Sequence, residues 1–77
     1  MGGIVNTSYK YIRFTREWKG RWTCKNKRSG YVLGIVSYYD EWSQWVFAPA
    51  LFNPTVHSAS CLRDIADFLE QLNDEEK

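Results

Sequence analysis

The hydrophobic pattern of this chain changes once along its length, and the change dictates the order of its secondary structure. Up to Pro49, apolar and polar residues alternate in short runs, which is typical of half-buried strands. From Cys61 to Leu72, apolar residues recur at the spacing of an amphipathic helix. The sequence therefore predicts an α+β fold in which residues 8–49 form an antiparallel four-stranded β-meander. A C-terminal α-helix over residues 60–72 then covers one face of that sheet.

Turn-forming residues separate the expected strands and leave short segments outside them. Residues 17–20 and 27–30 each end in a glycine, which accepts the positive φ of a tight turn. Residues 40–43 provide the third turn. We expect the remainder to form a loose N-terminus, a loop and an acidic tail, at residues 1–7, 50–59 and 73–77. A chain of 77 residues is long enough for a single domain only.

Alternation within each strand assigns its side chains to one of the two faces of the sheet. The face expected to meet the helix carries Ile12, Phe14, Trp22, Cys24, Leu33 and Ile35. Gly34 interrupts the third strand, where a glycine indicates a β-bulge or the close approach of a neighbouring group. Val36 and Tyr38 are expected on the opposite face. Ser60 is the expected N-cap of the helix, with Ser58 as the alternative.

Charge is divided unevenly between the two halves of the chain. Residues 1–39 carry eight Lys and Arg residues and one Glu, a net charge of +7. Residues 40–77 carry eight acids and two basic residues, a net charge of −6. Such an asymmetry indicates an anionic partner for the first half. The alternative is internal, since an acidic helix can offset a basic sheet within one molecule.

Aromatic and basic side chains are expected to share the sheet face that the helix leaves open. With one tryptophan from the third turn they make eight candidate binding residues: Tyr9, Tyr11, Arg13, Arg21, Lys25, Lys27, Tyr38 and Trp42. Aromatic rings stack on the bases of single-stranded nucleic acid, at about 1–3 kcal/mol each, while cations neutralise its phosphates. Trp42 also suits a protein interface, where an exposed Trp is a frequent anchor. The alternatives are cross-strand pairing and solubility for the Tyr and Lys residues, and packing over the sheet edge for Trp42.

Residues suited to catalysis or to metal binding are few. His57 is the only histidine and Cys61 follows it near the expected helix start, but no third group is evident to orient such a pair. Cys24, Cys61 and His57 lack the spacing of a zinc site. The glycines match no phosphate-binding loop. The sequence thus predicts a protein that is not an enzyme and that carries neither a metal ion nor a cofactor.

Three further features bear on the compartment. The first ten residues lack the charged and apolar regions of a signal peptide. The longest apolar run, residues 45–48, is far too short to span a membrane. Two cysteines are too few for a disulfide scaffold of this size. We therefore expect a cytoplasmic protein with reduced thiols and no membrane partner.

Two stretches of the sequence resemble a group of short phage and prophage proteins. One begins at Asn26 and reads NKRSGYVLGIVSYYDEWSQWVFAP, and the other begins at Cys61 and reads CLRDIADFLEQL. The group shares the patterns N-K-x-S-G-x-x-L-G-x-I, W-x-x-Y-x-F-x-P and C-L-x-D-I-x-x-F. The similarity covers residues 22–72 and departs from the group at Trp45 and at Ser43. It implies a phage-type protein in the cytoplasm of a bacterial host, and it implies no catalytic role.

Three functions are compatible with these patterns. The first is a small non-enzymatic protein that binds and inhibits a host protein or protein–nucleic-acid complex, as small phage proteins directed at bacterial defence do. The second is a single-stranded nucleic-acid-binding module that uses the basic sheet face. The third is a homo-oligomer, such as a homodimer, that holds an anionic nucleotide between its subunits. Steep salt dependence of oligonucleotide binding distinguishes the second function, and a strictly monomeric protein argues against the third.

Overall fold

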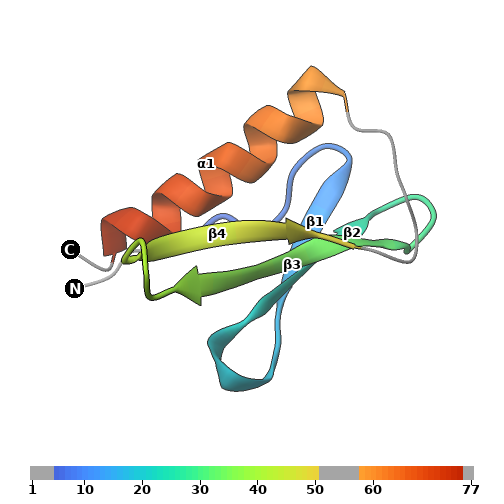
Figure 1. The fold of residues 1–77 in the computed structure, drawn as a ribbon. Helices are drawn as coiled ribbons and strands as arrows, with labels where there is room; N and C mark the ends of the chain where they lie inside the picture. The colour runs from blue at the N-terminus through green and yellow to red at the C-terminus, as the bar shows by residue number, and fades with distance from the viewer. Residues whose placement is uncertain (1–4, 51–57, 76–77) are drawn as a thin grey trace.

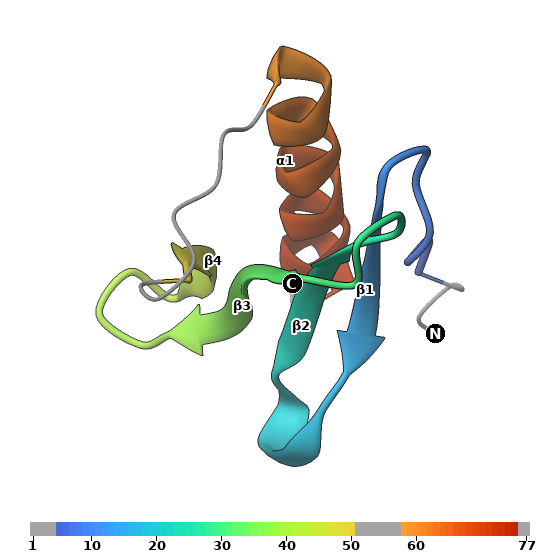
Figure 2. The same cartoon turned by 90° about the vertical axis from the view of Figure 1, so that its right-hand side faces the viewer.

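The structure, a computed structural model, describes residues 5–50 and 58–75 (Figures 1 and 2). Its elements are β1 (Ile12–Arg16), a short 3-10 turn η1 (Trp18–Gly20), β2 (Trp22–Asn26), β3 (Val32–Tyr39), β4 (Gln44–Pro49) and α1 (Ala59–Glu75). Each strand pairs antiparallel with its neighbours in sequence, and α1 lies across one face of the sheet. The predicted α+β fold, a four-stranded meander followed by one helix, is confirmed. The expected loop at residues 50–59 falls mostly outside the described residues, and no helix within them is long and apolar enough to span a membrane.

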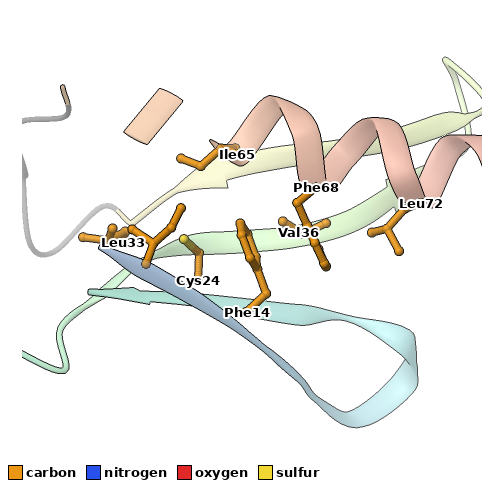
Figure 3. Packing of buried hydrophobic residues seen from close by; sticks show 8 residues of the cluster. Phe14, Cys24, Leu33, Val36, Ile65, Phe68 and Leu72 are labelled. Carbon is orange, nitrogen blue, oxygen red and sulfur yellow. The ribbon is translucent and has the colours of Figure 1, made fainter. Parts of the chain in front are cut away.

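One hydrophobic core joins the helix to the sheet (Figure 3). Its buried members are Ile65, Phe68 and Leu72 of α1 and Ile12, Phe14, Cys24, Leu33 and Val36 of the strands. Phe68 stacks on Phe14 with ring centroids 3.9 Å apart, and it meets Trp22 edge-on at 5.1 Å. Aromatic pairs in such arrangements add attraction beyond the area that they bury. Phe68 therefore joins α1 directly to both β1 and β2.

A β-bulge in β3 changes which of its side chains enter the core. The register of β2 on β3 skips Leu33, which becomes an extra residue between two cross-strand pairs. Leu33 and Val36 are both buried, whereas Ile35 is 42% exposed on the face opposite α1. An extra residue reverses the side-chain alternation beyond it. The prediction is therefore right for Leu33 but wrong for Ile35 and Val36, which exchange faces.

Gly34 follows the bulge and lies against β4. A Cβ atom at this position would meet the ring of Phe47 and lie 2.5 Å from the carbonyl oxygen of Ala48. Only a glycine leaves room for such an approach. The sequence offered a bulge or a close approach as reasons for this mid-strand glycine, and both apply to the same short stretch.

The helix is longer at both ends than the apolar pattern predicted. Ser58 is its N-cap, since the Ser58 hydroxyl accepts a hydrogen bond of 3.2 Å from the N–H three residues later. Ser60, the expected cap, lies inside the first turn instead. At the other end, Asn73 Oδ1 accepts a hydrogen bond from the Trp45 N–H at 2.7 Å, which joins the last turn of α1 to β4. The helix also includes residues 73–75, which were expected to form part of an acidic tail.

Residues 5–7, which were expected to belong to a loose N-terminus, lie against the helix, while residues 1–4 of that segment lie outside the described residues. Gln71 accepts a hydrogen bond from the Asn6 N–H at 2.8 Å and donates one to the Asn6 carbonyl oxygen at 3.2 Å. The Thr7 carbonyl oxygen accepts a hydrogen bond from the Phe14 N–H at 2.8 Å. The chain consequently reverses its direction before β1, and this strand begins later than the sequence predicted.

Candidate functional site

The eight predicted binding residues do not share one face of the sheet. Tyr9 and Tyr38 turn toward the side that α1 covers. Arg13 and Lys25 remain on the open face. The other four lie at or beyond the ends of strands: Tyr11, Arg21, Lys27 and Trp42. The single aromatic and basic platform that strict alternation predicted is therefore divided into separate surfaces.

Tyr9 faces α1 and holds the N-terminal segment against it. Its ring packs edge-on against Phe14 with centroids 5.9 Å apart, and its hydroxyl donates to Asp67 Oδ2 at 2.7 Å. Gln71 Nε2 donates to the Tyr9 hydroxyl at 2.8 Å. Burial and the hydrogen-bonded Asp67 carboxylate raise the pKa of Tyr9. Its predicted place on the open face is wrong, because the bend before β1 carries the ring to the helix side.

Tyr38 also leaves the open face, for a different reason. The bulge at Leu33 reverses the alternation, so Tyr38 shares a face with Val36 and is the cross-strand partner of Trp45. The Tyr38 and Trp45 rings meet edge-on with centroids 5.8 Å apart. Although Tyr38 is 43% exposed, its ring is on the opposite side of the sheet from the open-face cations. The sequence prediction placed Tyr38 on the wrong face, because it did not include the one extra residue of the bulge.

Arg13 and Lys25 form the basic part of the open face. They are direct cross-strand partners in the pairing of β1 with β2. Like charges placed directly opposite each other repel, so an anion bound between the two side chains would relieve an unfavourable contact. Within the described residues, neither side chain makes an ion pair. The pair is therefore free to meet a negatively charged ligand.

The NKRSG turn between β2 and β3 presents two more cations. Asn26 Oδ1 accepts hydrogen bonds from the Arg28 N–H at 2.8 Å and from the Ser29 N–H at 3.1 Å. Gly30 supplies a φ of +78°, which closes the turn. Asparagine, serine and glycine thus shape the backbone, while the side chains of Lys27 and Arg28 are exposed. The motif has a structural role at three positions and leaves two cations free to bind.

An open hollow of about 740 Å³ lies between this turn, the bend before β1 and the start of α1. We name it the basic hollow; its lining residues are Lys10, Tyr11, Asn26, Lys27, Arg28, Ser58, Ser60 and Cys61. Three of these residues are cationic and none is acidic. Figure 1 shows the β2–β3 turn and the first turn of α1 at the same end of the molecule. The potential in the hollow is positive, which favours anions over neutral or cationic ligands.

Sequence reasoning missed the turn between β1 and β2, residues 17–21, which we name the Trp18 tip. Trp18 is 81% exposed, more than any other large apolar side chain that the structure describes. The tip projects from the sheet on the side away from α1 (Figures 1 and 2). Lys19 and Arg21 lie within three residues of Trp18 in the sequence, whereas the Arg16 guanidinium lies over the Trp22 ring, 5.8 Å from its centroid. The available signal was the position of this tryptophan in a turn that ends in Lys-Gly, where a side chain lies beyond the core.

The turn between β3 and β4, residues 40–43, carries an exposed tryptophan in different surroundings, and we name it the Trp42 tip. Trp42 is 64% exposed and rests edge-on against Tyr39, with ring centroids 4.9 Å apart. Asp40 and Glu41 precede it, so this tip is acidic. The two rings form a small apolar patch beside carboxylates, and exposed aromatic residues are enriched at protein interfaces.

The cysteines were the other candidates for chemistry. Cys24 is fully buried, and burial raises the pKa of its thiol to about 12. Since the thiolate is the reactive form, this thiol is a weak nucleophile at neutral pH. Cys61 lines the basic hollow, while His57, the only histidine considered beside it, lies outside the described residues. In residues 5–50 and 58–75, no three His, Cys, Asp or Glu side chains gather as a group that could hold a metal ion.

Comparisons with known proteins assign no family to this chain. No protein-family model matches it, and neither a curated protein nor a solved structure is significantly similar to it. Its function is therefore inferred from the geometry and the charge of its own surface.

Proposed function

We propose that this chain is a small non-catalytic protein that binds nucleic acid along the β1–β2 hairpin. The observation that carries the proposal is the segregation of charge, since residues 10–28 hold eight Lys and Arg side chains and one acid, Glu17. All eight cations lie on the hairpin, on the bend before it or on the turn that follows it. Within the described residues, none of them makes an ion pair with Asp64, Asp67 or Glu70 of α1. The absence of direct partners on these acids supports an external anion as the partner of the cluster.

The cations occur in three groups, and their spacing favours a polymer as the ligand. The basic hollow holds one group, Arg13 and Lys25 lie in the middle, and the Trp18 tip carries the third group at the far end. The five residues of β1 alone extend over about 17 Å, at roughly 3.3 Å per residue. A strand of phosphates can contact all three groups, whereas a single nucleotide can use only one. The spacing thus supports nucleic acid rather than a sequestered nucleotide.

The acidic residues of α1 also favour binding of an anionic ligand to the β1–β2 hairpin. Exposed acids of α1, among them Asp67 and Glu70, lie on the layer opposite the open face. An extended polyanion is repelled from that layer and attracted to the hairpin, which projects away from it. The charge distribution therefore favours one face and one path for the ligand.

The test of this proposal is fluorescence anisotropy with a labelled single-stranded oligonucleotide over a range of salt concentrations. Each phosphate contact on a single strand contributes about −0.7 to the slope of log affinity against log salt. The combined variant Arg13→Ala and Lys25→Ala should therefore bind more weakly and lose about 1.4 from this slope. Arg63→Ala removes an exposed cation from α1 and is the matched control, with affinity and slope unchanged. An affinity that does not respond to salt contradicts the proposal.

A second candidate function is docking to a host protein, and the Trp42 tip favours it. Tryptophan and tyrosine dominate the binding energy of many interfaces, and here Trp42 and Tyr39 are exposed side by side. In view of the resemblance to phage proteins, such docking would make the chain a non-enzymatic inhibitor of a host component, alone or on nucleic acid. The two functions use different hairpins, so variants of one tip leave the other surface intact.

A further inference from the structure

Trp18 differs from the other tryptophans of the chain in having no packing partner. Trp22 meets Phe68, and Trp45 meets Tyr38, in edge-on contacts. Among the described residues, no aromatic ring packs against Trp18. Among the described residues it is the most exposed large apolar side chain, and the core does not explain its presence.

The backbone of the Trp18 tip holds the indole in this exposed position. The Glu17 N–H donates to the Arg21 carbonyl oxygen at 2.7 Å and closes the end of the hairpin. Within the turn, Lys19 has a φ of +61° and Gly20 a φ of +74°. Two successive left-handed residues define a tight turn, so the tip is shaped before any ligand arrives. A ligand that meets the indole does not have to order a loop first, which favours binding.

The side chains near Trp18 limit the kind of ligand that suits it. Lys19 and Arg21 supply two cations in the same turn as the indole, with Glu17 as the single acid. The Arg16 guanidinium lies over the Trp22 ring instead. An indole face offers stacking area to a flat base, and the cations can reach the phosphates on either side of that base. An acidic peptide would use the cations but would leave the indole without a stacking partner. Flat anionic ligands that alternate rings with phosphates fit both features.

We propose that Trp18 stacks on an unpaired base at the end of the cationic path, so that the chain prefers single-stranded nucleic acid to duplex. In a duplex the bases already stack on one another and turn their faces away from the protein. The inference rests on the proposed function, because it assigns a role to one more residue of the same surface.

The experiment compares two polymers and two tryptophans. Binding of a labelled oligothymidylate and of a base-free deoxyribose-phosphate polymer of equal length is measured for the wild type, Trp18→Ala and Trp42→Ala. Trp18→Ala should bind oligothymidylate about tenfold more weakly, with an unchanged salt slope and unchanged affinity for the base-free polymer. Trp42→Ala removes the other exposed tryptophan and should match the wild type on both polymers. The wild type should also bind oligothymidylate more tightly than a duplex of equal length.

The other possible results distinguish failure of the stacking role of Trp18 from failure of the proposed function. If the wild type binds both polymers and Trp18→Ala behaves like it, the stacking role is wrong while the proposed function stands. An equal loss on both polymers, or equal wild-type affinity for duplex and single strand, also rules out stacking. If the wild type binds neither polymer, the proposed function fails and the role of Trp18 fails with it. Circular dichroism of Trp18→Ala should match the wild type, because the indole makes no core contact.

Discussion

The two hairpins of the sheet both end in an exposed tryptophan, yet their surroundings are opposite in charge and in attachment. The Trp18 tip carries two cations, Lys19 and Arg21, with one acid, and it projects away from α1. The Trp42 tip contains two acids, Asp40 and Glu41. It belongs to the β3–β4 hairpin, which the hydrogen bond to Asn73 joins to α1. Exposure alone would make both rings candidates for binding, with Trp18 at 81% and Trp42 at 64%. The charge around each ring distinguishes them, since one suits a polyanion and the other a protein surface.

The hairpins also depend on different contacts with the rest of the molecule. The β1–β2 hairpin meets the helix through Phe68, which contacts a ring on each of its strands. The β3–β4 hairpin depends on the close approach of β4 to Gly34. Each hairpin can therefore be perturbed separately, and the expected effects fall in a clear order.

The largest effect is expected from Phe68→Ala. Removing this fully buried ring leaves a cavity between α1 and the first two strands, and such changes cost about 3–5 kcal/mol in the free energy of unfolding. Urea denaturation measures the loss, and Leu62→Ala is the control, because Leu62 is 51% exposed on the same helix. Hydrogen exchange should show a greater loss of protection in β1 and β2 than in β4. An equal loss of hydrogen-exchange protection in all four strands would mean that both hairpins depend on Phe68 for their packing against α1.

A smaller effect, centred on the other hairpin, is expected from Gly34→Val. The new side chain collides with the Phe47 ring and with the Ala48 carbonyl group, and overpacking of this kind costs about 1–3 kcal/mol. The free energy of unfolding should fall by that amount, and loss of protection should concentrate in β4. Ile35→Val, at the exposed neighbour, should change stability by less than about 0.5 kcal/mol. A neutral Gly34→Val would show that β4 does not approach β3 so closely.

The smallest effect is expected from Tyr9→Phe, and it depends on pH. Loss of the hydrogen bonds to Asp67 and Gln71 should cost about 0.5–1.5 kcal/mol at neutral pH. Since the folded state raises the pKa of Tyr9, its hydroxyl stabilises the fold below the ordinary tyrosine pKa of about 10. Above that pH the unfolded chain loses the proton first, and the contribution disappears.

The measurement for Tyr9→Phe is the difference in free energy of unfolding from the wild type, followed from neutral to alkaline pH. This difference should shrink once the pH exceeds about 10. Tyr11→Phe is the control, because the Tyr11 hydroxyl has no hydrogen-bond partner among the described residues. A difference that stays constant over the whole range would exclude a raised pKa for Tyr9.

Sequence patterns predicted the element order well because each pattern depends on local backbone geometry. Alternation correctly placed Phe14 and Cys24 in the core, and helical spacing correctly located α1. Alternation failed beyond Leu33, since a single extra residue exchanged the faces of Ile35 and Val36. Gly34 marked the place where this failure could occur, but a glycine alone does not state how many residues a strand gains or loses.

The candidate site was harder to predict than the fold, for a related reason. Tyr9 was assigned to the open face because residues 8–16 alternate like a strand, although the chain bends before β1 and the ring binds Asp67. Conversely, the sequence patterns did not identify Trp18, because neither alternation nor helical spacing states which side chain of a turn remains exposed. The cations are visible in the sequence as a group, since charge is read directly from composition. Their division into three groups depends on tertiary structure, which local patterns do not contain.

The hydrogen bond from the Trp45 N–H to Asn73 has a consequence for self-association. It occupies a donor on the outer edge of β4, and Pro49 at the end of the same strand has no N–H to offer. At the opposite border of the sheet, the Thr7 carbonyl oxygen pairs with Phe14 of β1. Each border thus has part of its backbone occupied or without a donor, which disfavours edge-to-edge pairing at these positions. Continuation of the sheet of one copy by the sheet of another would have to compete with these contacts.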